Sequence, residues 1–579
     1  MYSTCIKETS EVCFHGCYCC TTPFLGLPEP QTVTSIATTV AASRYDFELA
    51  MTSSIWPNSK FTNHESLPSL YDCSSNFIKS FPQYSLTNQA DKIREKEYYN
   101  LTLSNHVCLD YFGNGLFSYS QQQSHSQAST STSPPPPPKF EQPFFGISYK
   151  AVSLNTQLQY SGPESDLENK IRKRIMSFMN ISEDDYTMVF TANQSSAFKL
   201  LADYYPFQSH KNLLTVYDHE SEAVKLMIES SKKKGAQVMS AEFLWPTLRI
   251  QSGKLQKKIA SKKKTKKGLF VFPLQSRMTG NRYSYFWMGM AQENGWNVLL
   301  DACALGPKDM ETLGLSLFKP DFLICSFYKV FGENPSGFGC LFVKKSSISI
   351  LKDSATTNTS IGIVSLVPAI IPTQLSEELS SAADIEEPEI EELFTLPIIE
   401  SEKSGNQELE YKGLDLADSL GLILISARAR YLINWLVNAL MTLHHPNSEN
   451  GHPPVRIYGP KIKFDRGPAV AFNVFDWKGE RIDPQLVQKL ADRNNISLSC
   501  GYLNNIWFPD KNDQEQKNWT VEPRTGTSSI SVVTAAIGFL TNFEDVYRLW
   551  MFVSRFLDAD FVEKEKWRYT ALNQNIVEV

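Results

Sequence analysis

The central part of the chain alternates between two hydrophobic patterns. Short apolar runs bounded by turn residues indicate buried strands, and longer segments of mixed polarity indicate helices. Strands are expected at 186–191, 212–217, 237–242, 269–273, 298–301, 322–327 and 340–343. Helices are expected at 165–179, 195–204 and 220–234. This alternation predicts a layered α/β domain with a mostly parallel sheet, and ligands bind such sheets at the carboxyl ends of the strands.

A different pattern follows in the C-terminal part. Residues 414–443 are expected to form one long helix, with an apolar face that includes Trp435 and Leu436. Strands at 455–464 and 469–475 and helices at 484–493 and 542–558 then predict a smaller α+β domain. The predicted organisation is therefore a large domain over 89–375, an acidic insertion over 376–410, a connecting helix over 411–445 and a small domain over 446–579.

The N-terminal part lacks such periodicity. Residues 1–88 are expected to be a mostly disordered leader, rich in cysteine, serine and threonine. A helix is expected at 92–101 and a short strand at 107–113, and residues 121–140, a Gln/Ser/Thr tract ending in prolines, are expected to be a loop. Five cysteines crowd the first twenty residues, but no second CxxC pair stands at zinc-finger spacing, so no metal site is predicted.

Composition narrows the function. The chain has 579 residues, 42% of them hydrophobic, with a net charge of -6, which argues against a dedicated nucleic-acid or membrane-surface protein. The sequence has no run of eighteen apolar residues, so no membrane span is predicted. The eight lysines of residues 254–267 are interpreted as a solvated loop. The eleven cysteines are too few and too unevenly spread for a disulfide scaffold, which predicts reduced thiols and a cytoplasmic location, and the hydroxyl-rich leader leaves a plastid transit peptide open.

The stretch Cys325–Gly339, which reads CSFYKVFGENPSGFG, carries the candidate chemistry. An apolar run precedes Lys329, which is expected in a turn rich in glycine and proline, and a second apolar run follows. A lysine held at a strand end is poorly solvated, which disfavours the ammonium form and makes the amine a usable nucleophile toward an aldehyde. A lone lysine in a hairpin is otherwise a surface residue, so the interpretation depends on residues elsewhere in the chain.

The motif Ser326-Phe327-Tyr328-Lys329-x-Phe331-Gly332, followed by Pro335-x-Gly337-x-Gly339, resembles the Schiff-base lysine segment of class V aminotransferases and cysteine desulfurases. Within that group the chain is most similar to the N-terminal domain of molybdenum cofactor sulfurases and their plant sulfurase-like relatives, from about residue 109 to 556. The C-terminal molybdenum-cofactor-binding domain of the full sulfurases is not included. The resemblance implies the fold type I of pyridoxal 5'-phosphate (PLP)-dependent transferases, with a seven-stranded sheet, PLP as cofactor with Lys329 as its attachment point, and a homodimer.

The resemblance also implies roles for residues at strand ends. Asp301 corresponds to the aspartate that keeps the cofactor's pyridinium protonated, and His219 to the histidine that stacks on the ring and moves protons. Ser195 and Ser326 correspond to phosphate-binding residues, and Ser195 starts a helix whose N–H groups favour anions. Arg277 falls where desulfurases have an asparagine on the cofactor's phenolic oxygen. Without the resemblance, Asp301 would be interpreted as a turn former and His219 as a helix cap.

The chain departs from the family at further positions besides Arg277. Asn193 replaces a glycine in the phosphate turn, which is tolerable if the asparagine adopts the left-handed conformation. Tyr502 and Asn504 occupy the positions of the sulfurase cysteines, so Cys500 is the stand-in candidate for the catalytic nucleophile. In the family an arginine binds the substrate carboxylate, and Thr534 occupies its position here. Weaker binding of an amino acid is therefore expected.

The expected function is that of a PLP-dependent transferase that mobilises sulfur from L-cysteine, a small-molecule amino-acid substrate. A protein thiolate would attack the substrate sulfur. Alanine would be released, and a persulfide would remain on the protein. Two alternatives stay open: a PLP-binding regulatory or degenerate homologue without persulfide chemistry, and a PLP enzyme acting on another substrate. No nucleic acid, membrane or metal is expected as a partner.

Overall fold

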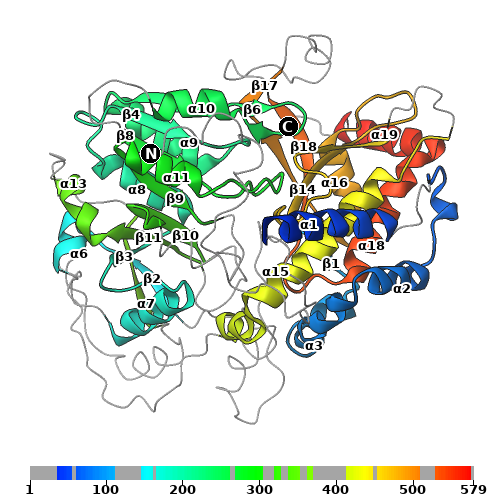
Figure 1. Ribbon diagram of the computed structural model, residues 1–579, viewed down its shortest axis with the longest axis horizontal. Coiled ribbons are helices and arrows are strands. Elements are labelled where there is room, and N and C mark those ends of the chain that lie inside the picture. Colours follow the sequence, from blue (N-terminus) through cyan, green and yellow to red (C-terminus); the bar gives the residue numbers. More distant parts are fainter. Residues whose placement is uncertain are drawn as a thin grey trace, which may run out of the picture.

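The computed structural model describes residues 36–54, 60–110, 145–160, 165–260, 268–303, 318–327, 337–352, 362–368, 412–446, 453–508 and 529–574 (Figure 1). Predictions for residues 1–35, the loop 121–140, the insertion 376–410 and Lys329 fall outside these ranges.

A seven-stranded sheet forms the centre of the large domain. Its order is β3 (Tyr186–Thr191), β11 (Gly339–Lys344), β10 (Phe322–Ser326), β9 (Trp296–Asp301), β8 (Gly268–Phe272), β4 (Asn212–Thr215) and β5 (Gln237–Ser240). Strand β11 runs antiparallel to both of its neighbours, and the remaining pairings are parallel. The predicted mostly parallel sheet is therefore confirmed.

Helices cover both faces of this sheet. They are α6 (Leu154–Tyr160), α7 (Asp166–Phe178), α8 (Gln194–Tyr204), α9 (Glu222–Lys233), α10 (Ser252–Ile259), α11 (Phe286–Glu293) and α13 (Ile348–Lys352). Alternate strand residues enter different cores: Phe190 packs on the α7 and α11 side, and Val189 on the α8 and α9 side. Helix α10 includes the first part of the lysine-rich segment, so the loop prediction is wrong there. Lys254 and Lys258 pair with Glu242.

The C-terminal domain is built on a four-stranded antiparallel sheet in the order β13 (Val455–Tyr458), β14 (Ala469–Val474), β18 (Ile530–Ala536) and β16 (Ser499–Leu503). Its helices are α16 (Pro484–Arg493), α18 (Phe543–Ser554) and α19 (Ala559–Gln574). The smaller α+β domain expected from the sequence is present.

The long helix α15 (Lys412–Met441) leads into this domain, and Gly421 interrupts it with a φ of 75°. Its segment Leu414–Met441 is long and apolar enough to cross a membrane by length and composition alone. Trp435, Leu436 and Leu440 of this helix are instead buried in the core of the C-terminal domain. The helix also carries Arg428, which is buried and paired with Asp91. These contacts are those of a core helix.

Short strand pairs complete the structure. Strand β2 (Phe145–Tyr149) pairs with β12 (Val364–Pro368), and β1 (Val107–Cys108) pairs with β15 (Ile496–Ser497). A three-stranded sheet joins β6 (Phe243–Leu244) and β7 (Arg249–Ile250) of the large domain to β17 (Ile506–Trp507) of the C-terminal domain. The two domains therefore share backbone hydrogen bonds.

Residues 36–54 and 60–88 are ordered, contrary to the sequence prediction for this part of the leader. The N-terminal segment contains α1 (Ile36–Ser53), α2 (Leu70–Ser80), α3 (Asn88–Glu97), α4 (Asn100–Leu103) and the 3-10 helices η2 (His64–Ser66) and η3 (Pro82–Thr87). The blue helices α2 and α3 lie on the side of α15 and α18 in Figure 1. Disorder is therefore the wrong prediction for residues 36–54 and 60–88, because widely spaced aromatic residues anchor this segment. Phe77, for example, stacks on Phe543 with ring centroids 4.8 Å apart.

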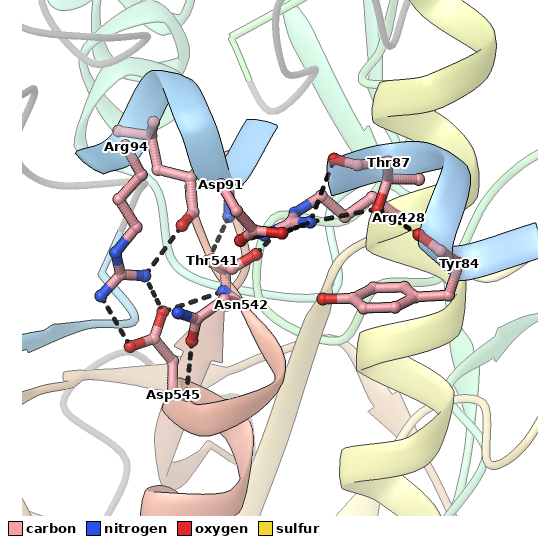
Figure 2. Close-up of polar contacts among 10 residues, drawn as sticks. Tyr84, Thr87, Asp91, Arg94, Arg428, Thr541, Asn542 and Asp545 are labelled. Atoms are coloured by element: carbon pink, nitrogen blue, oxygen red, sulfur yellow. Dashed lines mark hydrogen bonds and ion pairs between the residues drawn. The ribbon is translucent and has the colours of Figure 1, made fainter. Parts of the chain in front are cut away.

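The predicted start of the large domain at residue 89 is also wrong. Residues 88–110 pack on the C-terminal domain, where β1 pairs with β15 and the amide of Ala536 donates to the carbonyl of Leu109 at 2.7 Å. Two buried arginines hold this junction (Figure 2). Arg94 pairs with Asp545, and Arg428 pairs with Asp91.

Candidate functional site

A small pocket, open to solvent, lies at the carboxyl ends of the parallel strands. Its lining comes from residues that follow β3, β4, β8 and β9, namely Gln194, Tyr217, His219, Ser221, Pro273, Gln275, Arg277, Asp301 and Cys303. Three candidates from the sequence, His219, Arg277 and Asp301, are therefore brought together at one site. This is the edge of an α/β sheet at which ligands bind.

Asp301 ends β9 and is held in place by two donors. The hydroxyl of Tyr217 donates to Oδ2 at 2.8 Å, and the amide of Cys303 donates to Oδ1 at 2.9 Å. Burial, and then the charge of Asp301, raise the pKa of Tyr217 well above its usual value, so the phenol keeps its proton. Asp301 therefore presents a fixed carboxylate to the cavity.

His219 follows β4 and pairs with its own neighbour, Asp218. Nδ1 of His219 lies 2.8 Å from Oδ1 of Asp218, and both side chains are buried. Ser276 and Thr279 also donate to this carboxylate, each at 2.7 Å. Burial alone would raise the pKa of Asp218, but the hydrogen bonds from His219, Ser276 and Thr279 outweigh it and lower the pKa. The Asp218 carboxylate is therefore ionised inside the protein.

Arg277 lies on the turn that follows β8, and this turn is packed against the C-terminal domain. Gly280 has a φ of +70°, and a Cβ there would lie 2.4 Å from the carbonyl oxygen of Ala469. The amide of Gly467 donates to the carbonyl of Gly280 at 2.8 Å. Only glycine fits this close approach, so the C-terminal domain fixes the turn that carries the cavity's arginine.

The helix α8 starts beside the cavity. Asn193 caps it by accepting from the amide of Ser196 at 2.8 Å, and Ser195 lies half-buried in the first turn. Asn193 has a φ of -166°, which is extended backbone, so the expectation of a left-handed asparagine is wrong. Asparagine replaces the family's glycine here because the side chain serves as an N-cap. The free N–H groups of this turn favour an anion.

Ser326, the second phosphate candidate, ends β10 and is buried. It pairs with Gly339 of β11, and Gly339 pairs with Thr191 of β3. A Cβ on Gly339 would lie 2.9 Å from the backbone of Asn193. The glycine therefore lets the end of β10 approach the start of α8, where Ser195 lies.

Residues 502–505 of the C-terminal domain are bound to the segment that carries His219. The amide of Glu220 donates to the carbonyl of Tyr502 at 2.9 Å, and the amide of Asn504 donates to the carbonyl of Asp218 at 2.8 Å. The side chain of Asn505 donates to the carbonyl of Tyr217 at 3.0 Å. We call residues 502–507 the strap, because β17 at its end continues the pairing onto β6.

Cys500, the predicted nucleophile, lies just before the strap on β16. Its Sγ donates to the carbonyl of Pro484 at 3.3 Å, and Cys500 is not among the residues that line the cavity. Cys500 is exposed at the surface, but desolvation of its thiol, followed by the charges of Asp483 and Asp492, raises the pKa of Cys500 to about 12. The thiolate, which is the reactive form, is therefore scarce at neutral pH.

This raised pKa predicts slow alkylation. At pH 8, Cys500 in the folded protein should react with iodoacetamide at least about tenfold more slowly than an unperturbed thiol, because a higher pKa leaves less thiolate at any given pH. The rate should rise steadily between pH 8 and 10. Mass spectrometry of the peptide that contains Cys500 measures it, with the urea-unfolded protein as the reference. Equal rates in the folded and unfolded protein would contradict the prediction.

The sequence analysis missed three residues of this site: Tyr217, Asp218 and Cys303. Each lies within two residues of a predicted site residue and follows a buried strand. Cys303 lines the cavity, and its Sγ lies 3.7 Å from the carbonyl oxygen of Ile324. Their positions in the sequence could have predicted them, because residues that follow parallel strands share one edge of the sheet.

The donor set fits PLP. Asp301 supplies a carboxylate for a protonated ring nitrogen, His219 an aromatic ring, Arg277 a cation, and the start of α8 a set of N–H groups for the phosphate. Lys329 lies outside the described residues, but β10, which leads to it, ends beside β9 with Ile324 opposite Asp301. Strand β10 therefore ends at the edge of the sheet where the cavity lies.

Comparisons with known proteins find molybdenum cofactor sulfurases. A molybdenum cofactor sulfurase from Solanum lycopersicum is 24% identical over 534 residues, which are 84% of this chain and 60% of that protein. The human molybdenum cofactor sulfurase is 28% identical over 360 residues, 58% of this chain and 37% of that protein. The chain is similar to the molybdenum cofactor sulfurases. The resemblance drawn from the sequence is thereby confirmed, and the chain spans about 60% of the length of the tomato sulfurase.

No family model matches the chain. Among solved structures, a cysteine desulfurase from Thermococcus onnurineus is 16% identical, with a TM-score of 0.49, over 81% of this chain and 98% of that one. An alanine-glyoxylate aminotransferase from Nostoc is 13% identical, with a TM-score of 0.41, over 68% of this chain and 86% of that one.

Proposed function

We propose that this sulfurase-like chain is a PLP-dependent transferase that mobilises sulfur from L-cysteine. The observation that carries the proposal is the convergence of Asp301, His219 and Arg277 on one cavity at the carboxyl ends of β4, β8 and β9. The similarity to molybdenum cofactor sulfurases supports the reaction class.

Each residue has a separate task in this proposal. Lys329 holds the cofactor, Asp301 keeps a proton on its ring nitrogen, and Ser195 and Ser326 bind its phosphate. Arg277 lies in the cavity as the cation available to an oxyanion. When bound, PLP withdraws electrons from the α-carbon of an amino acid. His219, whose Nδ1 is taken by Asp218, moves protons through Nε2.

The reaction also needs a thiol to receive sulfur. L-cysteine and a protein thiol would give alanine and a protein persulfide: the new S–S bond forms as the substrate C–S bond breaks, and the carbon takes a proton. Cys500 is the thiol proposed from the sequence, and Cys303 is the cysteine that lines the cavity among the described residues. Separate replacement of each one by alanine distinguishes them.

A specific observation favours a second candidate, a PLP-binding protein without persulfide chemistry. By the resemblance, Tyr502 and Asn504 of the strap stand where sulfurases have cysteines, and backbone hydrogen bonds join the strap to Asp218 and Glu220. The raised pKa of Cys500 points the same way. This candidate keeps the cofactor site and loses the sulfur transfer, whereas a PLP enzyme with a different substrate would keep both the cofactor and a turnover.

The proposal includes a homodimer and a reducing compartment such as the cytoplasm. Support for the compartment comes from the sequence: eleven unevenly spread cysteines are too few for a disulfide scaffold. Support for the dimer comes from the family resemblance alone.

The proposal is tested with the purified full chain and added PLP. We expect a visible absorbance band from the bound cofactor, and stoichiometric or catalytic formation of alanine from L-cysteine. A persulfide-reactive alkylating probe followed by mass spectrometry then identifies the cysteine that carries sulfur. Bound cofactor with no alanine from cysteine would support the second candidate, and the absence of bound cofactor would overturn both.

A further inference from the structure

We infer that Asp218 is a positioning residue that fixes the tautomer of His219, so that Nε2 is the proton-accepting atom in the cavity. This inference rests on the proposed function only for its consequence in turnover. The tautomer itself is a property of the folded chain.

The hydrogen bonds of Asp218 determine which ring nitrogen of His219 carries the proton. Both oxygens of Asp218 accept hydrogen bonds from hydroxyl groups, one from Ser276 and one from Thr279, each at 2.7 Å. An ionised carboxylate has no proton to donate. The contact of 2.8 Å between Asp218 Oδ1 and His219 Nδ1 is therefore a hydrogen bond in which Nδ1 carries the proton.

The other ring nitrogen is then available to the cavity. His219 lines the cavity, and no group in the described part of the chain is recorded as a hydrogen-bond partner of its Nε2. With the proton on Nδ1, neutral Nε2 has a free lone pair. It can accept a proton from a ligand and return it, while Asp218 stabilises the charge that His219 gains.

The surrounding structure keeps the pair rigid. Asp218 is fully buried, and its carbonyl accepts the amide of Asn504 from the strap. Ser276 and Thr279 lie on the turn that packs against the C-terminal domain through Gly280. His219 itself pairs with Leu503 of the strap. Both domains therefore hold the orientation of one imidazole ring.

The test is nitrogen-15 NMR of histidine-labelled full-length protein at pH 8, with His219→Gln to assign the signal. We expect the wild type to show a protonated Nδ1 and an unprotonated Nε2. In Asp218→Asn the amide can donate to Nδ1, so the tautomer should switch to a protonated Nε2. Thr279→Val is the matched control: it removes a donor from the other oxygen of Asp218 and should keep the wild-type pattern.

Turnover gives the second readout. Asp218→Asn should lower kcat for alanine formation at least about tenfold with a smaller change in KM, because binding residues stay in place. A wild-type spectrum with the proton on Nε2, or with both nitrogens protonated at pH 8, would overturn the inference. So would an unchanged tautomer in folded Asp218→Asn. If the chain forms no alanine, the proposed function fails while the spectra still decide the tautomer.

Discussion

Lys329→Ala should lower the rate of alanine formation from L-cysteine by on the order of 10³-fold and abolish the visible absorbance of bound PLP. In the proposed function the lysine amine would form the covalent link to the cofactor aldehyde and would also serve as a base for the substrate. Removal of the amine takes away both contributions, whereas the carboxylate of Asp301 and the anion-binding turn of α8 remain. The measurements are the absorbance spectrum of the gel-filtered protein and the initial rate of alanine release.

Lys345→Ala is the matched control for this experiment. Lys345 is an exposed lysine that follows β11, the strand antiparallel to β10. Its replacement should leave the spectrum and the rate within about twofold of the wild type, because surface substitutions rarely change a distant site. Persistence of the cofactor band in Lys329→Ala after gel filtration would show that another amine holds the cofactor.

The large domain was predictable because its signals are local. Each buried strand is a short apolar run, and each helix start carries its own cap, such as Ser165 before α7. No local sequence pattern predicted that the N-terminal segment, including residues 88–110, packs on the C-terminal domain. Phe77 and Arg94 read as ordinary residues of a polar segment, and their partners Phe543 and Asp545 are more than 400 residues away in the chain. Long-range burial of this kind leaves no periodic trace in the sequence.

The main residues of the candidate site could be predicted from the sequence, but the contacts that hold them in place could not. The resemblance to the sulfurases identifies His219 and Asp301, which lie after β4 and at the end of β9. It does not show that Tyr217 donates to Asp301 or that Asp218 pairs with His219. It also does not show that the strap binds the segment 217–220, because that contact joins two domains through backbone groups, which any sequence provides.

Arg428→Met should lower the free energy of unfolding by about 2 to 3 kcal/mol, because it removes a buried arginine from its half-buried partner Asp91 and leaves its acceptors without this donor. Figure 2 shows the arginine between the N-terminal segment and the turn before α18. Its Nε donates to the carbonyl of Thr541 at 2.8 Å, and Nη1 donates to Thr87 Oγ1 at 3.1 Å and to Asp91 Oδ2 at 3.0 Å. Methionine fills similar space but leaves all these acceptors without a donor. Urea unfolding followed by tryptophan fluorescence measures the change.

Two further variants separate the charge from the packing. Arg428→Met with Asp91→Leu should recover part of the loss, because no unpaired carboxylate remains. Arg174→Met is the control on an exposed pair: its partners Asp415 and Asp418 have side chains 58% and 36% exposed, so the loss should stay below about 1 kcal/mol. Equal losses in Arg428→Met and Arg174→Met would contradict the prediction. A large loss confined to Arg428→Met would show that the N-terminal segment and the C-terminal domain fold as one unit, since this arginine bonds to both.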